Sequence, residues 1–455
     1  MLADQRGVFL NIIKWFFLAT LIGVVVGIAD AMFLFLLDYS MDATGENPLY
    51  FMPLPFVFYL VFLLSKKIAP KSTDYSTDAA INKINSYRPV DIISTIKAFF
   101  LPILTISFGG SAGKEAPCAD VGAGLGSLTS RIFRLSTADR RKLMICGVSA
   151  GFAGVFGVPI SGAIFGLEVL WVGFIFYEVM FPAFVAGITA YQVTSFLGVK
   201  YVYHPITVAP VFSEGFFIKV LFAGIIFGLV SLVLIEVMKF ARVMFRFISF
   251  KYSAFWKCFI GGSILVLVGL VISPDYLGLG MDQADAVLHG AEPRHTFGFL
   301  IKIFTTSITF AAGGVGGAVT PIIYIGAQAG SVMSTFLELD PATVAALGVV
   351  SVLAGTTNAP LAASIMAIEL FGTAIAPYAA VSCVISFMMT GSRTIFSKQR
   401  ISIFSKDALD DKPVVDKESR LTQATMPVKR ASIIKLTRHL IPHSNPKEKN
   451  KKKKN

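Results

Sequence analysis

Apolar segments dominate the chain. They run almost without a break from Val8 to about Phe396 and are separated by short polar turns. The first of them, Val8 to Leu37, contains Lys14 and lacks a small-residue cleavage site at its end, which indicates a retained, long and tilted helix rather than a signal peptide. Many later segments are interrupted by Gly and Pro. The pattern predicts an all-α polytopic membrane protein with roughly sixteen to eighteen membrane helices, many too short or too tilted to span simply.

Two glycine-rich segments repeat each other. Gly109–Pro117 reads Gly-Gly-Ser-Ala-Gly-Lys-Glu-Ala-Pro, and 204 residues later Gly313–Pro321 reads Gly-Gly-Val-Gly-Gly-Ala-Val-Thr-Pro. A second pair, Ala153–Glu168 and Ala354–Glu369, matches at an offset of 201 residues. Such segments can be ordinary close-packing faces of membrane helices. Two aligned copies that both end in Pro favour an ion site instead, as in transporters built from internal repeats.

Charge orients the two copies. The first copy and its apolar helix are followed by five basic residues, Arg131, Arg134, Arg140, Arg141 and Lys142. The equivalent stretch of the second copy, Thr335 to Ala346, contains two acids and no Lys or Arg. Because positive residues stay on the cytoplasmic side, the copies are expected to end on opposite membrane faces. The sequence therefore predicts an inverted repeat in which broken helices start near the midplane, with their N-termini facing each other.

Composition and charge set the domain boundaries. Of the 455 residues 55% are hydrophobic and 15% charged, with a mean hydropathy of +0.70, which leaves no room for a large soluble domain. From Ser405 onward there are 14 Lys and Arg against 6 Asp and Glu, so this segment supplies +8 of the net charge of +12. We expect a transmembrane ion-transport unit at 1–404, with repeat halves at about 54–200 and 256–397. Residues 405–455 are expected to form a basic, disordered cytoplasmic tail that touches lipid headgroups rather than nucleic acid.

Enzymatic and metal chemistry have little support. The four cysteines, Cys118, Cys146, Cys258 and Cys383, show no paired spacing and are expected to serve packing. Gly109–Gly113 and Gly147–Gly151 both match Gly-x-Ser-x-Gly, but no strand pattern precedes them and no histidine occurs before His204. His289 and His295 lie in a polar loop and are expected to be solvated. We expect no enzyme activity, no metal and no cofactor.

Glu115 stands at the start of the first predicted half-helix. A helix N-terminus leaves N–H groups unpaired and carries roughly half a positive charge, so it binds an anion without a full cation. A carboxylate at this mouth, in an apolar setting, would compete with a permeating anion and leave when protonated. Glu115 is therefore predicted to be a gate and a proton carrier. The alternative is a structural Glu that caps the helix.

Three segments resemble the CLC family of chloride channels and chloride/proton antiporters. Gly113–Pro117 is similar to the family's gating-glutamate motif, and Gly316–Pro321 to the loop whose backbone amides hold the central anion. Ala153–Val169 resembles a third segment, which ends in paired acids. The resemblance implies a multi-pass protein of the cell membrane that transports chloride or a similar small anion. It also implies a homodimer with one pore per subunit, for which the helices around Phe181–Phe196 and Phe371–Met389 are candidate faces.

The resemblance also implies an anion site. Its residues would be Ser76, Gly113, Lys114, Gly317, Ala318, Val319 and Phe396. Ser76 corresponds to a family serine that is associated with a preference for chloride. Phe396 replaces a family tyrosine and lacks its hydroxyl. Asp78 is expected to cap the following helix and face away from the anion.

Proton coupling depends on a further position. Val169 replaces an inner glutamate of the proton-coupled members and cannot relay a proton, while Glu168 is expected to be a buried structural acid. The resemblance therefore leans toward a channel or a weakly coupled exchanger. The alternative is a proton-coupled antiporter of chloride or of another anion such as fluoride or nitrate.

Overall fold

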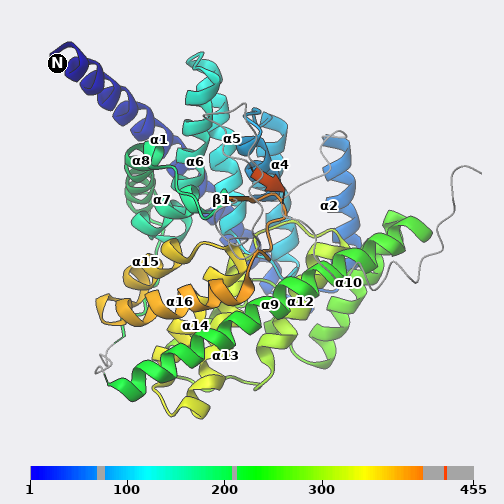
Figure 1. Cartoon of the computed structure of the whole chain (residues 1–455). Coiled ribbons are helices and arrows are strands. Elements are labelled where there is room, and N and C mark those ends of the chain that lie inside the picture. The colour runs from blue at the N-terminus through cyan, green and yellow to red at the C-terminus, as the bar shows by residue number, and fades with distance from the viewer. Residues whose placement is uncertain (1, 69–76, 207–212, 403–424, 428–455) are drawn as a thin grey trace, which may run out of the picture.

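The fold is a bundle of helices of very unequal length (Figure 1). A computed structural model describes residues 2–68, 77–206, 213–402 and 425–427. Within these ranges there are sixteen α-helices: α1 Leu2–Gly45, α2 Leu54–Ile68, α3 Thr77–Asn85, α4 Ile92–Ser107, α5 Glu115–Ile132, α6 Thr137–Phe156, α7 Pro159–Glu168, α8 Tyr177–Phe196, α9 Glu214–Lys251, α10 Ala254–Val271, α11 Met281–Leu288, α12 Gly298–Ala312, α13 Val319–Leu337, α14 Pro341–Thr357, α15 Pro360–Phe371 and α16 Ala376–Thr390. Two 3₁₀ turns, Pro274–Tyr276 and Thr373–Ile375, complete the helical elements.

The helices repeat as two sets of eight, α1–α8 and α9–α16. Each set opens with a long helix, of 44 residues in α1 and 38 in α9, and continues with seven shorter ones in the same order. The first residues of α5 and α13 are 204 positions apart, as are those of α6 and α14. We take α2–α8 and α10–α16 as the two repeat halves.

The two sets run in opposite directions. In Figure 1, α5 leads to the upper end of the molecule and α13 to the lower end. Arg131 and Arg134 are exposed where α5 ends. Glu338 ends α13, with its carboxylate 3.8 Å from the Lys219 amine. The predicted inverted repeat, with its two copies ending on opposite faces, is confirmed.

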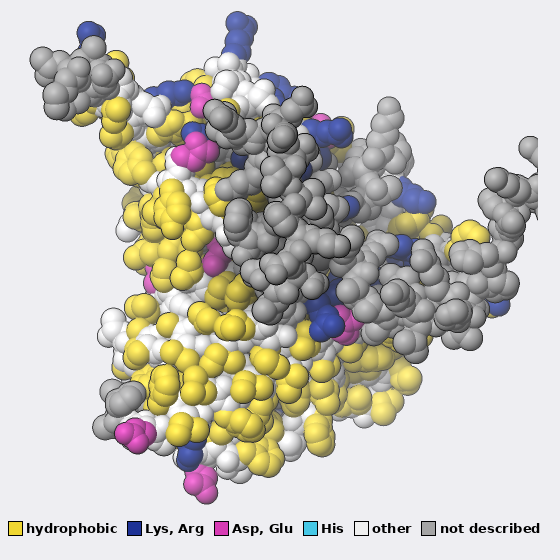
Figure 2. Space-filling model, in the orientation of Figure 1, with side chains coloured by type: hydrophobic (Ala, Val, Ile, Leu, Met, Phe, Trp, Pro, Cys, Tyr) yellow, Lys and Arg dark blue, Asp and Glu magenta, His cyan; other side chains and the backbone are white. Residues whose placement is uncertain are grey.

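The length and composition of the helices fit a membrane protein. Five of the described helical segments are long and apolar enough to cross a bilayer: Arg6–Gly45, Tyr177–Phe196, Glu214–Lys251, Ala254–Val271 and Thr373–Thr390. Figure 2 shows hydrophobic side chains over the lower part of the visible face, where α9, α15 and α16 lie in Figure 1. Phe196 and Phe250 are each 90% exposed in the isolated chain. Such surface is expected to face lipid tails.

Close packing accounts for the later glycines of both repeated segments. A Cβ atom on Gly122 in α5 would lie 2.0 Å from the carbonyl oxygen of Gly147 in α6. In the second set, a Cβ atom on Gly326 in α13 would lie 2.5 Å from the carbonyl oxygen of Gly348 in α14. These backbones approach so closely that any side chain would push the helices apart. The packing interpretation is therefore right for this part of the glycine pattern, whereas the earlier glycines shape the site described below.

The expectation of an all-helical chain was incomplete. Three short strands, β1 Trp171–Val172, β2 Arg400–Ser402 and β3 Thr425–Pro427, form one sheet in the order β1-β2-β3. β1 and β2 are parallel, and β2 and β3 are antiparallel. Pairing satisfies backbone groups of the chain as it leaves α7 and α16. β3 belongs to the predicted tail, the rest of which lies outside the described residues.

Candidate functional site

The N-termini of α5 and α13 meet through their glycine loops. The Gly113 N–H donates to the Gly317 carbonyl at 2.6 Å, and the Gly317 N–H donates to the Gly113 carbonyl at 2.7 Å. A Cβ atom on Gly113 would lie 2.5 Å from Thr320 Oγ1, and one on Gly317 would lie 2.9 Å from the Ala116 nitrogen. Only glycine allows the two loops to come this close. The two unpaired helix starts are thereby held against each other.

Glu115 binds the opposite helix. It is the first residue of α5 and only 1% exposed. Its Oε2 accepts a hydrogen bond from the backbone N–H of Thr320 at 3.1 Å, and its Oε1 accepts one from the Thr320 hydroxyl. Thr320 is the second residue of α13, so this N–H has no partner within its own helix. The carboxylate therefore lies where the positive end of α13 would hold a free anion.

Five of the predicted anion-site residues flank this contact. Lys114 and Ala318 are the residues that cap α5 and α13 at their starts, and both are half-buried. Val319 is the first residue of α13 and is buried. Gly113 and Gly317 form the bridge between the loops. Ser76 lies outside the described residues.

Phe396 lies in a segment bonded to α3 and α14. Its side chain is buried, and its N–H donates to Thr394 Oγ1 at 3.1 Å. The Thr394 hydroxyl in turn donates to the carbonyl of Thr356 in α14, at 3.2 Å. On the other side, Asp78 in the first turn of α3 accepts hydrogen bonds from the Ser397 hydroxyl at 2.9 Å and the Lys398 N–H at 3.1 Å.

The expected orientation of Asp78 was therefore wrong. Its carboxylate does not face away from the candidate site but is directed at the chain that follows Phe396. The physical reason is that this segment has left helix α16, so its N–H and hydroxyl donors need an acceptor. Asp78 thereby fixes the position of the Phe396 segment relative to α3.

Thr320 is the functional residue that the sequence interpretation missed. It supplies both hydrogen bonds to Glu115. The available signal was a hydroxyl residue directly before Pro321 in the second glycine-rich copy, at a position where the first copy has Ala116.

A second pair of carboxylates links the two repeats. Glu168, at the end of α7, accepts two N–H bonds from the start of α15, at 3.1 and 2.8 Å. Glu369, in the last turns of α15, accepts two from the start of α7, at 2.9 and 2.8 Å. The donors are Leu361 and Ala362 in the first case, and Ile160 and Ser161 in the second. Each acid thus caps the half-helix of the other repeat. Glu168 is buried and hydrogen-bonded as expected, and its purely structural role stays a prediction.

Neither Gly-x-Ser-x-Gly serine is presented as a nucleophile. Ser111 and Ser149 are fully buried. The Ser111 hydroxyl lies 2.9 Å from the Thr306 hydroxyl, and the Ser149 hydroxyl donates to the carbonyl of Ala163 at 3.1 Å. The first contact joins the α4–α5 loop to α12, and the second joins α6 to α7. The four cysteines are buried and free, as expected.

Among the described residues, one histidine cluster could ligate a metal ion. His204, Asp285 and His289 each place one ligand atom within 4.8 Å of the others. His204 Nε2 lies 3.2 Å from the Asp285 carboxylate, and the His289 ring is hydrogen-bonded to the Asp285 carbonyl at 2.9 Å. Burial lowers the pKa of His204, so its ring is neutral near pH 7. These contacts already explain the cluster as a junction between the α8–α9 linker and α11, and the expected absence of a metal stays a prediction.

Comparisons with known proteins agree with this geometry. The family profile described as "Voltage gated chloride channel" matches residues 57–391. A "Chloride/fluoride channel protein" of Pseudomonas syringae pv. tomato is 33% identical over 88% of this chain and 89% of its own length. An "H(+)/Cl(-) exchange transporter ClcA" of Salmonella paratyphi B is 24% identical over 77% of this chain and 74% of its own.

Solved structures show the same fold. The crystal structure of a CLC-type fluoride/proton antiporter superimposes with a TM-score of 0.80 at 26% identity, over 87% of this chain and 99% of the other. A slow cyanobacterial Cl⁻/H⁺ antiporter superimposes with a TM-score of 0.73 at 19% identity, over 83% and 94% of the two chains. The protein is a polytopic membrane protein that belongs to the voltage gated chloride channel (CLC) family.

Proposed function

We propose that this protein transports chloride or a similar small inorganic anion across the membrane, with Glu115 as the gate. One observation carries the proposal: the buried Glu115 carboxylate is bound to the first turn of α13 by the Thr320 N–H at 3.1 Å and by the Thr320 hydroxyl. A negatively charged group thus occupies a site suited to an anion. Family membership supports anion transport as the activity.

The gate works by competition. Ionised Glu115 satisfies the N-terminus of α13 and excludes a free anion from it. When the carboxylate takes up a proton, it loses the charge that favours this position, and an anion can replace it. Lys114, directly before Glu115, adds a positive charge near the site. Because no other full charge belongs to the two loops, the anion is held by backbone dipoles and can leave again.

We further propose that coupling to protons is weak or absent. The position of the inner acid is taken by Val169, which is apolar and fully buried. Each subunit of a homodimer would carry its own pathway, in the cell membrane and with the C-terminal tail on the cytoplasmic side. The abundance of Arg and Lys after α5 supports this orientation.

Fluoride/proton antiport is a second candidate function. The solved fluoride/proton antiporter and the relative named for both chloride and fluoride support it.

An anion-flux panel separates the candidates. Liposomes containing the purified protein would be loaded in turn with chloride, fluoride or nitrate, and anion and proton movements followed together. The main proposal predicts chloride flux without uphill proton movement. Fluoride flux accompanied by protons at a fixed ratio would establish the second candidate, and no flux of any anion would reject both.

A further inference from the structure

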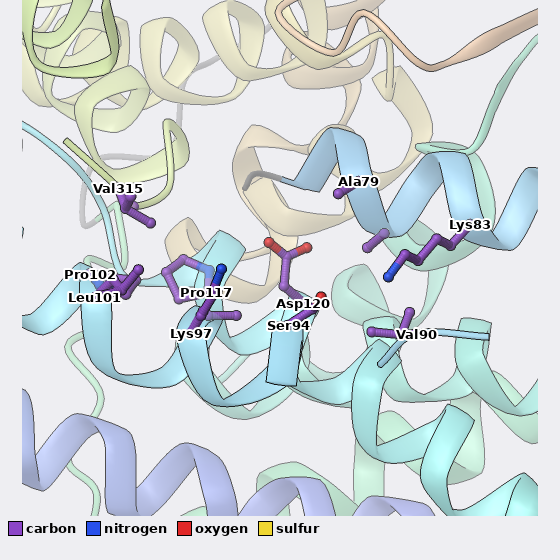
Figure 3. Close-up of a pocket in the computed structure, with 13 residues that line it drawn as sticks. Ala79, Lys83, Val90, Ser94, Lys97, Leu101, Pro102, Pro117, Asp120 and Val315 are labelled. Carbon is purple, nitrogen blue, oxygen red and sulfur yellow. The ribbon is translucent and has the colours of Figure 1, made fainter. Parts of the chain in front are cut away.

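A cavity lies beside the gate, between α3, α4, α5 and the loop at Val315–Gly316 (Figure 3). Its volume of about 50 Å³ leaves space for roughly three to five water molecules. In Figure 3 the Asp120 carboxylate points into the middle of this space, with the Lys97 amine on one side and the Lys83 amine on the other. The remaining walls are mostly apolar.

Asp120 has an unused acceptor. Its Oδ1 atom is buried and has no hydrogen-bond partner among the described groups. Lys83 is committed to Asp91, at 3.1 Å, and the Lys97 amine donates to the carbonyl of Ser65. A buried carboxylate oxygen without a protein partner is costly unless water or a proton satisfies it. The cavity next to it can supply the water.

The cavity extends from the start of α5, next to the gate, to the region where α3 ends. At one end it is lined by Pro117 and Gly316, which lie in the first turn of α5 and in the glycine loop bonded to it. At the other end it is lined by Lys83 and Val90. The backbone of Val90 exchanges hydrogen bonds with the hydroxyl of Ser127, near the basic end of α5. The cavity therefore extends from the gate toward the basic face, where Lys83 pairs with the exposed Asp91.

We propose that Asp120 is the proton-relay residue that supplies Glu115 from the basic face. The proposal rests on the gating function proposed above. Asp120 follows Glu115 by five positions in α5, a rise of about 7.5 Å with a turn of about 140° around the helix axis, so the water chain passes around the first turn of α5, where Pro117 lines the cavity. Protonated Asp120 gives up its O–H proton to the water chain, and the chain delivers a proton to the Glu115 carboxylate. Asp120 is left ionised and takes a new proton from water at the basic face.

The charges around Asp120 suit a relay. Lys83 of α3 and Lys97 of α4 line the same cavity as Asp120, on either side of its carboxylate (Figure 3). Asp78, also on α3, repels the ionised form of Asp120 and is itself near Arg242 of α9. The loop at Val315–Gly316 contributes no titratable side chain. Because charges of both signs lie around the cavity that Asp120 faces, its carboxyl is suited to exchange a proton in either direction. Asp120 thereby supplies the gating proton by a path that does not pass the position of Val169, and the proposed weak coupling concerns proton transport across the whole membrane.

The test uses membrane patches that contain the full chain, with the pH lowered from about 7.5 to about 5.5 on one face at a time. The basic face is the one from which a thiol reagent labels the variant Arg134→Cys, since the four native cysteines are buried. Native protein should show an anion current that rises at least about threefold with acid on the basic face. Asp120→Asn should lose this rise and keep the response to the opposite face. Asp120→Glu should restore it.

Two further variants test whether the response to acid on the basic face depends on the cavity and Asp120 rather than on surface charge. Glu178→Gln removes an exposed acid that pairs with Lys142, one of the basic residues that follow α5, and should keep the response, because neither residue lines the cavity. Ala98→Leu fills the cavity from α4 and should lose the response with Asp120 intact. If Asp120→Asn does not fold, Ala98→Leu alone decides.

The outcomes also separate this proposal from the proposed function. A native-like response to the basic face in Asp120→Asn, or in Ala98→Leu, would overturn the relay while leaving the gate intact. An increased resting current with an unchanged pH response in Asp120→Asn would also overturn it, and would make the cavity an anion vestibule. If Glu115→Ala retained the pH response from both faces, the gating function itself would fail.

Discussion

Gly113 and Gly317 exchange both of their backbone hydrogen bonds, at 2.6 and 2.7 Å. They occupy equivalent positions in the two repeats, so the pair lies at the centre of the inverted arrangement. Neither loop is held by its own repeat alone. The bridge therefore positions the starts of α5 and α13 together, and with them Glu115 and Thr320.

A methyl group at Gly113 should open the gate. Its Cβ atom would lie 2.5 Å from Thr320 Oγ1 and 2.6 Å from Glu115 Oε2, so these two groups must separate. Gly113→Ala should raise anion flux at neutral pH at least about threefold and flatten its pH dependence. Efflux from liposomes measures both effects. Gly215→Ala is the matched control, because that glycine has no neighbour within 4 Å of an added Cβ and no positive φ. An unchanged flux in Gly113→Ala would show that the Gly113–Gly317 bridge does not contribute to closing the gate.

Removing the hydroxyl of Thr320 should make the gate easier to protonate. Thr320→Val keeps the backbone donor but deletes the side-chain donor to Glu115. Because a hydrogen bond to a charged group is worth about 1.5–3 kcal/mol, the midpoint of the flux–pH curve should move up by about one pH unit. Thr320→Ser should behave like native protein. A midpoint that moves to lower pH in Thr320→Val would contradict this account of the contact.

The reciprocal caps should matter for folding and not for gating. Glu168→Gln and Glu369→Gln each weaken two bonds to a half-helix of the other repeat. We expect each change to lower the free energy of unfolding by about 2 kcal/mol. Thermal unfolding in detergent measures this loss. The midpoint of the flux–pH curve should stay native, and a shifted midpoint in Glu168→Gln would show that this acid takes part in transport.

The dimer face should include α8. α8 packs against α7, α7 against α15, and α15 against α16. These four helices carry large exposed apolar side chains. Ile188→Cys on α8 is expected to form a crosslink between subunits under oxidation in the membrane. Phe247→Cys on α9 should stay monomeric on the same gel, although Phe247 is also exposed. If Ile188→Cys and cysteines at neighbouring positions on α8 gave only monomers, α8 would not belong to the dimer face.

The sequence allowed the central part of the site to be predicted, because its physics is local. Glycines and prolines at matched positions mark helix starts, and Glu115 lies at one of them. Thr320 and Asp78 were misjudged because their partners are distant in the chain: Thr320 bonds Glu115 across 205 positions, and Asp78 bonds Ser397 across 319. The β1–β2 pair likewise depends on a tertiary contact between segments that each carry too few residues to show a strand pattern.

The most direct test of the gate is anion efflux from liposomes across a pH series, with native protein compared with Glu115→Gln and Glu115→Ala. Native flux should rise as the pH falls, because protonation frees the N-terminus of α13. Both variants should give high flux that is largely independent of pH, and they should bind at least as much anion as native protein. A native-like pH response in a well-folded Glu115→Ala protein would contradict the assignment of Glu115 as the gate.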